Sequence, residues 1–162
     1  MKKMKNYKSI IELFENLADT DYLVMRNYEE FENENFVVDH PDIDLLCKNV
    51  KDITSKIDCK PKDDKDDKLH YVVNIKNRLV SIDIRHVGDN YFDKTWQQNV
   101  LSRKTKFNSF YIMSKADYYY TLLYHVCIHK KEIKKDYIEK LASLADECNA
   151  KFNFEDRFEI LN

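Results

Sequence analysis

Three aspartates have the spacing expected of a metal-binding site on a β-sheet. Asp42 and Asp44 stand two residues apart in a segment where polar and apolar residues alternate, and Asp83 lies in a second such segment. Side chains two apart on a strand point to the same face, with Cα atoms about 6.5–7 Å apart. Two carboxylates placed this way repel each other unless a cation sits beside them. If the two strands are neighbours, three carboxylates converge, and such hard oxygen ligands suit Mg²⁺, with Mn²⁺ as the alternative.

Basic residues near these acids could contact a substrate. Arg26 follows an apolar segment and could bind phosphate through its guanidinium, or pair with the nearby Glu29 or Glu30. Arg85 and His86 come just after the third aspartate and are further candidates for substrate binding. A plain ion pair between Arg85 and an aspartate explains that residue equally well. The aspartates themselves could alternatively be solvated residues at strand edges or helix caps.

His125, His129 and Lys130 form a second candidate group, since the two histidines are four residues apart in a predicted helix. This is the spacing of two metal ligands on one helix face. A zinc site is disfavoured, because the metalloprotease glutamate is absent between them and no third ligand is evident. The alternatives are core histidines bonded to their neighbours, or residues that line a substrate pocket.

The composition excludes several classes of protein. A net charge of −2 disfavours binding to duplex nucleic acid, which usually requires a clearly basic protein. The chain has a single glycine, Gly88, so neither the dinucleotide-binding loop nor the P-loop can be present. Its four cysteines are far apart in sequence, which suits a reducing compartment. No apolar segment is long enough to span a bilayer. These features predict a soluble, cytoplasmic protein without a membrane partner.

The elements that would position these residues follow from hydrophobic periodicity and capping signals. A short apolar segment predicts a strand at Tyr22–Met25. Further segments predict a strand opened by Pro41 and a hairpin of strands 71–75 and 79–85 around the turn 76–78. Gly88 and Asp89 predict a turn that needs positive φ. A further extended segment is predicted at 107–112. Helices are predicted at 10–18, around 50–57, around 92–100, from 115 to 129 and at 133–148. At 162 residues, the chain fits one α+β domain with a small mixed sheet core over about 20–112 and a helical part over about 113–162.

These residues resemble the nucleotidyltransferase superfamily related to DNA polymerase beta. The matching features are the strand Tyr22–Met25, the paired acids of Asp42-Ile43-Asp44-Leu45, and Asp83 on a later strand. More narrowly, the chain resembles stand-alone nucleotidyltransferase-like proteins from surface-polysaccharide gene clusters. The sequence departs from the family after its first strand, where Arg26 and Asn27 replace the usual Gly-Ser or Gly-Gly that meets the triphosphate.

The resemblance implies a metal-dependent nucleotidyltransferase that moves an NMP from an NTP to a small acceptor such as a sugar or polyol phosphate. In that assignment Asp42, Asp44 and Asp83 hold the metal and carry the chemistry, while Arg26 and Asn27 lie at the triphosphate. One alternative is a non-catalytic nucleotide-binding or regulatory module on the same fold. A metal-dependent nuclease is a weaker alternative, since arginine stands at position 85 where such enzymes have lysine. An RNA-modifying or toxin-type transferase is another.

Overall fold

The computed structural model describes residues 4–31, 42–62 and 69–150. The chain forms two compact units, Met1–Ile112 and Met113–Asn162, which are described separately below. Pro41, predicted to open a strand, and the last twelve residues of the predicted helical part lie outside the described residues. Among the helices that are described, none has the length and apolar character needed to cross a membrane.

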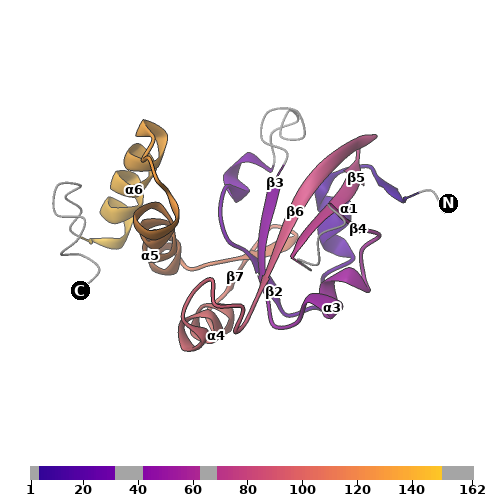
Figure 1. The fold of residues 1–162 in the computed structure, drawn as a ribbon, viewed down its shortest axis with the longest axis horizontal. Coiled ribbons are helices and arrows are strands. Elements are labelled where there is room, and N and C mark those ends of the chain that lie inside the picture. Colours follow the sequence, from indigo (N-terminus) through magenta and orange to yellow (C-terminus); the bar gives the residue numbers. More distant parts are fainter. Residues whose placement is uncertain (1–3, 32–41, 63–68, 151–162) are drawn as a thin grey trace. The chain divides into compact units, whose positions relative to one another are not determined.

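The first unit is built on one mixed sheet (Figure 1). Its strands lie in the order β1-β5-β6-β3-β2-β8-β7, and β4 pairs with the outer side of β5. At the centre, β3 runs parallel to β6, while β5 and β2 run antiparallel to their neighbours β6 and β3. The elements are β1 (Asn6–Tyr7), α1 (Ile10–Glu15), β2 (Tyr22–Val24), η1 (Tyr28–Glu30), β3 (Asp42–Cys47), α3 (Val50–Thr54), β4 (Lys60–Pro61), β5 (His70–Ile75), β6 (Arg78–His86), α4 (Lys94–Ser102), β7 (Thr105–Phe107) and β8 (Phe110–Ile112).

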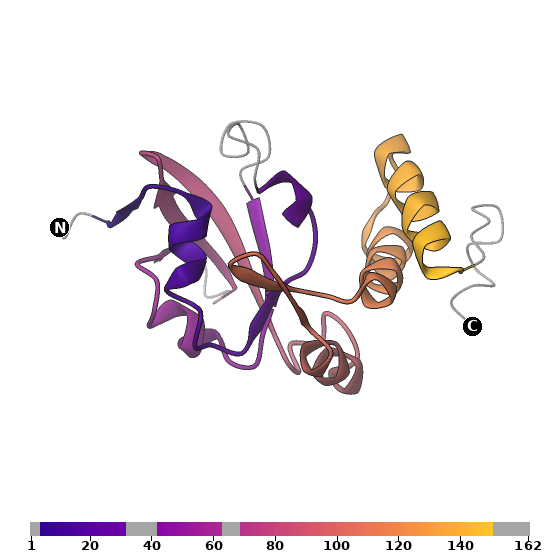
Figure 2. The ribbon, with the colours of Figure 1, turned by 180° about the vertical axis from the view of Figure 1, so that it is seen from behind.

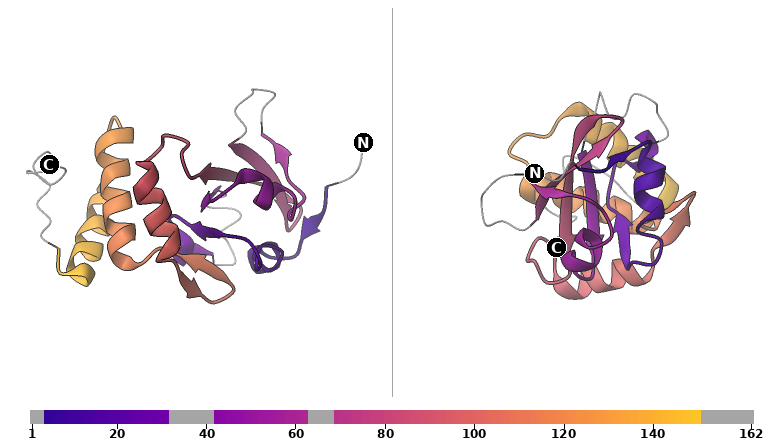
Figure 3. Two further views of the ribbon diagram at one scale, coloured as in Figure 1. Left: turned by 90° about the horizontal axis from the view of Figure 1, so that it is seen from below. Right: turned by 90° about the vertical axis from the view of Figure 1, so that its right-hand side faces the viewer.

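The two faces of the sheet differ in character because side chains alternate along each strand. One face, called the helical face here, carries Ile43, Leu45, Ile82 and Ile84, all fully buried. Helix α1 packs on this side, where Phe14 lies 5.8 Å from the ring of Tyr22 and 4.9 Å from that of Phe110, measured between centroids. Figure 2 shows α1 in front of the strands, and the right-hand view of Figure 3 shows it beside them. The opposite face, called the acidic face, carries Asp42, Asp44, Asp83 and Arg85.

Local sequence signals fix the ends of these elements. Ser9 caps α1 by accepting a hydrogen bond from the Glu12 backbone N–H at 3.1 Å. The helix ends at Glu15, earlier than the predicted end at residue 18. Directly after its end, the Asn16 side chain donates a hydrogen bond to the Glu12 carbonyl oxygen at 2.6 Å.

Two turns need the left-handed backbone conformation. The hairpin between β5 and β6 turns at Lys76 and Asn77, both with positive φ of 51° and 61°. This two-residue geometry matches the twist of the strands and replaces the predicted three-residue turn. Gly88 has φ of 84°, which confirms the positive φ predicted for that turn.

The second unit is a helix pair formed by α5 (Lys115–Tyr124) and α6 (Lys135–Cys148), joined through the π-helical segment η2 (His125–His129). Ser114 caps α5 by accepting from the Asp117 N–H at 3.1 Å. The left-hand view of Figure 3 shows α5 and α6 side by side. Leu141, Leu144 and Ala145 form the buried stripe of α6. The mixed sheet and these helices give the α+β architecture predicted from the sequence.

Candidate active site

Two of the three aspartates are direct neighbours on the acidic face. In the parallel pairing of β3 with β6, Asp44 is the register partner of Asp83, and Asp42 is the partner of Ser81. Adjacent strands lie about 4.8 Å apart, so the two paired carboxylates start from neighbouring Cα atoms and point the same way. Asp44 is only 7% exposed, whereas Asp42 at the start of β3 is exposed. The predicted adjacency of these strands is therefore present.

Arg26 holds the more buried carboxylate. Its Nε and Nη2 atoms donate to the two oxygens of Asp44 at 2.6 and 2.8 Å, which makes a bidentate ion pair. The pair is well shielded, since the side chains of Arg26 and Asp44 are 17% and 9% exposed. Burial opposes the charge on Arg26, but the hydrogen bonds and the negative charge of Asp44 outweigh it, so the pKa of Arg26 is raised. Arg26 thus pairs with Asp44, and compensates its charge without a metal.

His70 stands beside the other carboxylate. It is the register partner of Asp83 across the antiparallel strands β5 and β6, and its Nδ1 lies 2.7 Å from Oδ1 of Asp83. Both side chains are about one-third exposed, at 34% and 31%. The sequence analysis did not identify His70. The predicted hairpin contained the signal that could have identified His70. Counting the same number of residues along both strands, away from the Ile75–Arg78 pair, brings His70 opposite Asp83.

The loop between β6 and α4 places Asp89 and Tyr91 beside Arg85, which the sequence predicted to bind substrate or to pair with an aspartate. The sequence analysis did not identify Tyr91. Arg85 lies over the Tyr91 ring, 4.1 Å from its centroid, and its Nη1 is 3.8 Å from Oδ2 of Asp89. Oδ1 of Asp89 accepts hydrogen bonds from the Tyr91 backbone N–H at 3.0 Å and from Gln97 at 2.8 Å. Burial raises the pKa of Tyr91, and the charge of Arg26 acts against that rise. Tyr91 therefore connects the two arginines of the acidic face.

Asn27 has a left-handed backbone conformation shortly after the end of β2. It has φ of 58° and ψ of 19°, in the left-handed region, immediately before η1. Asparagine adopts this conformation more readily than most residues. The position where the sequence resemblance expects Gly-Ser therefore forms a left-handed turn in this chain, with the charged side chain of Arg26 just before it.

The remaining predicted residues lie elsewhere. His86 belongs to the helical face of β6, since it alternates with Arg85 and pairs in register with Cys47. It does not share a face with the aspartates. His125, His129 and Lys130 lie in the second unit, where the rings of the two histidines are 5.6 Å apart. Their predicted role in substrate binding stays a prediction.

The three aspartates fit a magnesium site by donor type, because they offer carboxylate oxygens from two adjacent strands. Among the described residues, however, no group of three or more His, Cys, Asp or Glu side chains is arranged to hold a metal ion. At Asp44, both carboxylate oxygens already accept N–H groups of Arg26, so the guanidinium stands where a metal ion would bind. Each carboxylate oxygen has a second lone pair, so a cation can bind if Arg26 shares or leaves Asp44.

Comparison with solved structures shows a similar fold in Helicobacter pylori. The crystal structure of JHP933 has a TM-score of 0.50 and 16% sequence identity to the chain, and the match covers 90% of the chain and 64% of JHP933. A second H. pylori structure, of a candidate nucleotidyltransferase, has a TM-score of 0.36 and 14% identity, covering 85% of the chain and 73% of its own. No protein-family model matches the sequence. No curated protein matches it either.

These likenesses concern the fold alone, and the chain spans about two thirds of the length of JHP933. The α+β fold predicted from the sequence is therefore similar to that of JHP933.

Proposed function

We propose that the chain is a metal-dependent nucleotidyltransferase that moves an NMP from an NTP to a small acceptor, such as a sugar or polyol phosphate. The observation that carries this proposal is the register pairing of Asp44 with Asp83, with Asp42 on the same face of the same strand. Nucleotidyl transfer needs carboxylates grouped in this way, because a divalent cation must be held beside the phosphates. The acceptor class and the polysaccharide context rest on the sequence resemblance.

In this proposal each of the three aspartates has a role that follows from its position. Asp42 and Asp44 would hold Mg²⁺, and Asp83 would complete its ligands. When bound, the ion would neutralise charge on the transferred phosphoryl group. Asp83 would also help to activate the attacking oxygen of the acceptor, accepting its proton when that oxygen belongs to a hydroxyl group. His70 would hold that carboxylate in place through its 2.7 Å contact. In this step the acceptor oxygen forms a bond to the α-phosphorus, the bond to the bridging β-phosphate oxygen breaks, and pyrophosphate leaves.

Arg26 would take part by exchanging partners. In the ion pair, the positive charge of Arg26 compensates the negative charge of Asp44. A bound NTP would offer phosphate oxygens to the guanidinium, while the accompanying cation would take its place at Asp44. Each exchange makes the other more favourable, so magnesium and NTP should bind cooperatively. Either one alone would leave Arg26 or Asp44 with a buried, uncompensated charge.

The second candidate function is a nucleotide-binding or regulatory module without catalysis. The observation that favours it is the same bidentate pair, since Arg26 occupies both oxygens of Asp44. If Arg26 neither leaves nor shares Asp44, phosphates could still approach Arg85 and Tyr91, but the acids could not take up a cation. The two functions therefore differ in whether magnesium changes nucleotide affinity.

Calorimetric titration with each of the four NTPs, with and without Mg²⁺, tests the proposal. We expect one NTP to bind with a magnesium-dependent affinity in the wild type, and that dependence to disappear in Asp42→Asn and Asp44→Asn. Asp19→Asn is the matched control, because it makes the same chemical change on an exposed turn. Binding that ignores magnesium would favour the non-catalytic module. No binding of any NTP to a folded wild type would refute the NTP-donor assignment.

A further inference from the structure

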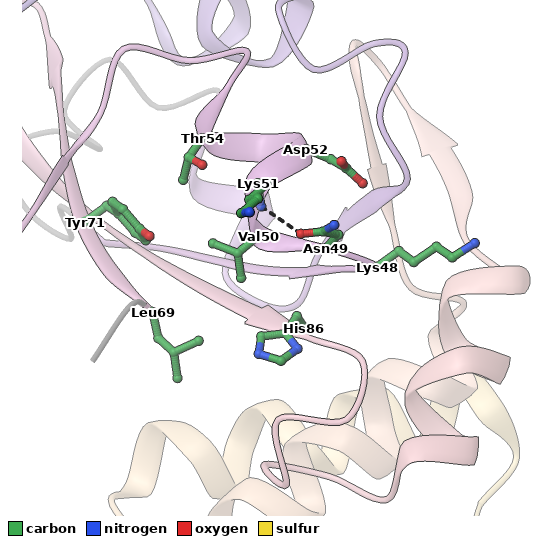
Figure 4. Close-up of a pocket in the computed structure, with 9 residues that line it drawn as sticks. All are labelled: Lys48, Asn49, Val50, Lys51, Asp52, Thr54, Leu69, Tyr71 and His86. Atoms are coloured by element: carbon green, nitrogen blue, oxygen red, sulfur yellow. Dashed lines mark hydrogen bonds between the residues drawn. The ribbon is translucent and has the colours of Figure 1, made fainter. Parts of the chain in front are cut away.

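Two hollows meet where the central parallel strands end. The first has a volume of about 850 Å³ and includes Lys48, Asn49, Lys51, Tyr71 and His86 in its wall (Figure 4). The second has a volume of about 690 Å³, and its wall includes Lys48 and Val87. Lys48 follows β3 directly, and His86 ends β6, so both hollows open at the carboxyl ends of these two strands.

The path of the chain explains why a crevice forms there. After β3 the chain enters α3, which lies over Tyr71 and His86 on the helical face. After β6 the chain turns the other way, and its loop places Tyr91 on Arg85 at the acidic face. Two neighbouring parallel strands whose connections leave toward opposite faces open a crevice at their carboxyl ends, and ligands of open α/β sheets bind in such crevices.

The first hollow has an excess of positive groups. Neither Lys48 nor Lys51 makes an ion pair within the part of the chain that the structure describes, and Asp52 is the one carboxylate among the residues of its wall. The second hollow shares Lys48 with the first, and its other lysine, Lys104, is already paired with Asp21. This concentration of unpaired ammonium groups contrasts with the net charge of −2 for the whole chain.

The other groups in the wall suit an organic anion. Nδ1 of His86 lies 3.1 Å from the carbonyl oxygen of Val87 and must donate to it, which leaves Nε2 available to a ligand. The Oδ1 atom of Asn49 accepts from the Lys51 N–H at 2.9 Å, which leaves its amide N–H₂ as a donor. Tyr71 and Leu69 supply an apolar wall. Figure 4 shows His86 below α3, between these residues and Asn49.

We infer that this hollow is a second binding site, separate from the aspartates, for a small organic phosphate or a similar anion. Lys48 and Lys51 would bind the anionic group, His86 and Asn49 would bind its polar substituents, and Tyr71 would cover its organic part. The site is distinct from Asp44 and Asp83, because it lies on the other face of the sheet and about 10 Å further along the strands. It does not depend on the nucleotidyltransferase assignment.

NMR titration of the full chain with phenyl phosphate and with inorganic phosphate tests this inference. We expect phenyl phosphate to shift the signals of residues 48–54 and 86, and to bind more tightly than inorganic phosphate because of the apolar wall. Lys48→Gln and Lys51→Gln should each weaken binding by about tenfold, the effect of losing one charge-assisted contact. Lys56→Gln is the matched control, since Lys56 is exposed just beyond α3 and absent from the wall.

A fourth variant separates this site from the acidic face. At a temperature at which it remains folded, Arg26→Gln should leave phenyl phosphate binding unchanged, because Arg26 contacts Asp44 on the opposite face. The inference is overturned if folded Arg26→Gln does not bind phenyl phosphate, or if Lys48→Gln and Lys51→Gln bind like the wild type. Equal affinity for phenyl phosphate and inorganic phosphate would also overturn it, as would the absence of any shift at millimolar concentrations.

Discussion

Replacing Arg26 by glutamine should destabilise the protein and at the same time make it responsive to magnesium. The substitution leaves Asp44 buried beside Asp83 with no cation. Removing one partner of a fully buried ion pair typically destabilises a protein by about 3–5 kcal/mol. Because the Arg26 side chain is 17% exposed and so not fully buried, we expect a loss at the lower end of this range, about 3 kcal/mol. For a chain of 162 residues this corresponds to a fall in Tm of about 6–12 °C.

Magnesium should restore part of that loss. The two carboxylates left behind offer a cation the place that the guanidinium held. A ligand at one hundred times its Kd stabilises the folded state by about 2.7 kcal/mol. Thermal unfolding followed by circular dichroism, with and without Mg²⁺, measures both effects. We expect a large magnesium-dependent rise in Tm for Arg26→Gln and a small one for the wild type.

Two further variants control this experiment. Arg78→Gln removes an arginine from an exposed position at the start of β6 and should change stability by no more than about 0.5 kcal/mol. The double variant Arg26→Gln/Asp44→Asn should be less destabilised than the two single effects together, and should lose the response to magnesium. The reasoning is refuted if Arg26→Gln melts like the wild type, or if magnesium stabilises both proteins equally.

Three shorter predictions follow from other contacts. His70→Asn should lower the rate of nucleotidyl transfer while the free energy of unfolding falls by at most about 1 kcal/mol. The stability effect is small because the pair of His70 with Asp83 is one-third exposed. Equal turnover by the wild type and His70→Asn would contradict this prediction. Burial raises the pKa of Cys47 to about 12 from 9.0, so the unfolded chain releases this proton first and stability should fall as pH rises from about 9 toward 12, by at most about 1.4 kcal/mol per pH unit. Denaturant titrations should show a shallower fall in Cys47→Ala. Asn27→Gly should keep the stability of the wild type, whereas Asn27→Val should lower it by about 1–2 kcal/mol, because valine is strained at φ of 58°; equal melting of both variants would show that this backbone shape is unimportant.

The sequence was sufficient to predict the features that depend on local periodicity. Alternation placed Asp42 and Asp44 on one face, and capping residues such as Ser9 and Ser114 located helix starts. These signals work because strand and helix periods are local properties of the chain. The pairing of β3 with β6, on which the site depends, could be stated only as a condition, since strand order is a property of the whole sheet.

Contacts between distant segments were harder to predict. Arg26 was assigned to phosphate or to neighbouring glutamates, because nothing local shows that the end of β2 lies against Asp44. The connection is made by the antiparallel strands, in which the Met25 N–H donates to the Asp44 carbonyl oxygen at 2.9 Å. His70 was missed because the turn was predicted to have three residues, which shifts the register by one position. A slip of one residue moves every side chain of a strand to the other face.

The same turn after β2 links the departure from the family to the proposed chemistry. A glycine loop supplies both a left-handed backbone and a neutral set of N–H groups. Here Asn27 supplies the backbone shape, while Arg26 adds a charge that its neighbour Asp44 compensates. A neutral loop can bind phosphate whether or not a cation is present. A guanidinium already paired with a carboxylate cannot, because it must exchange one anion for another. If the chain transfers nucleotides, cation and nucleotide binding must therefore be coupled more strongly than in a site built on a glycine loop.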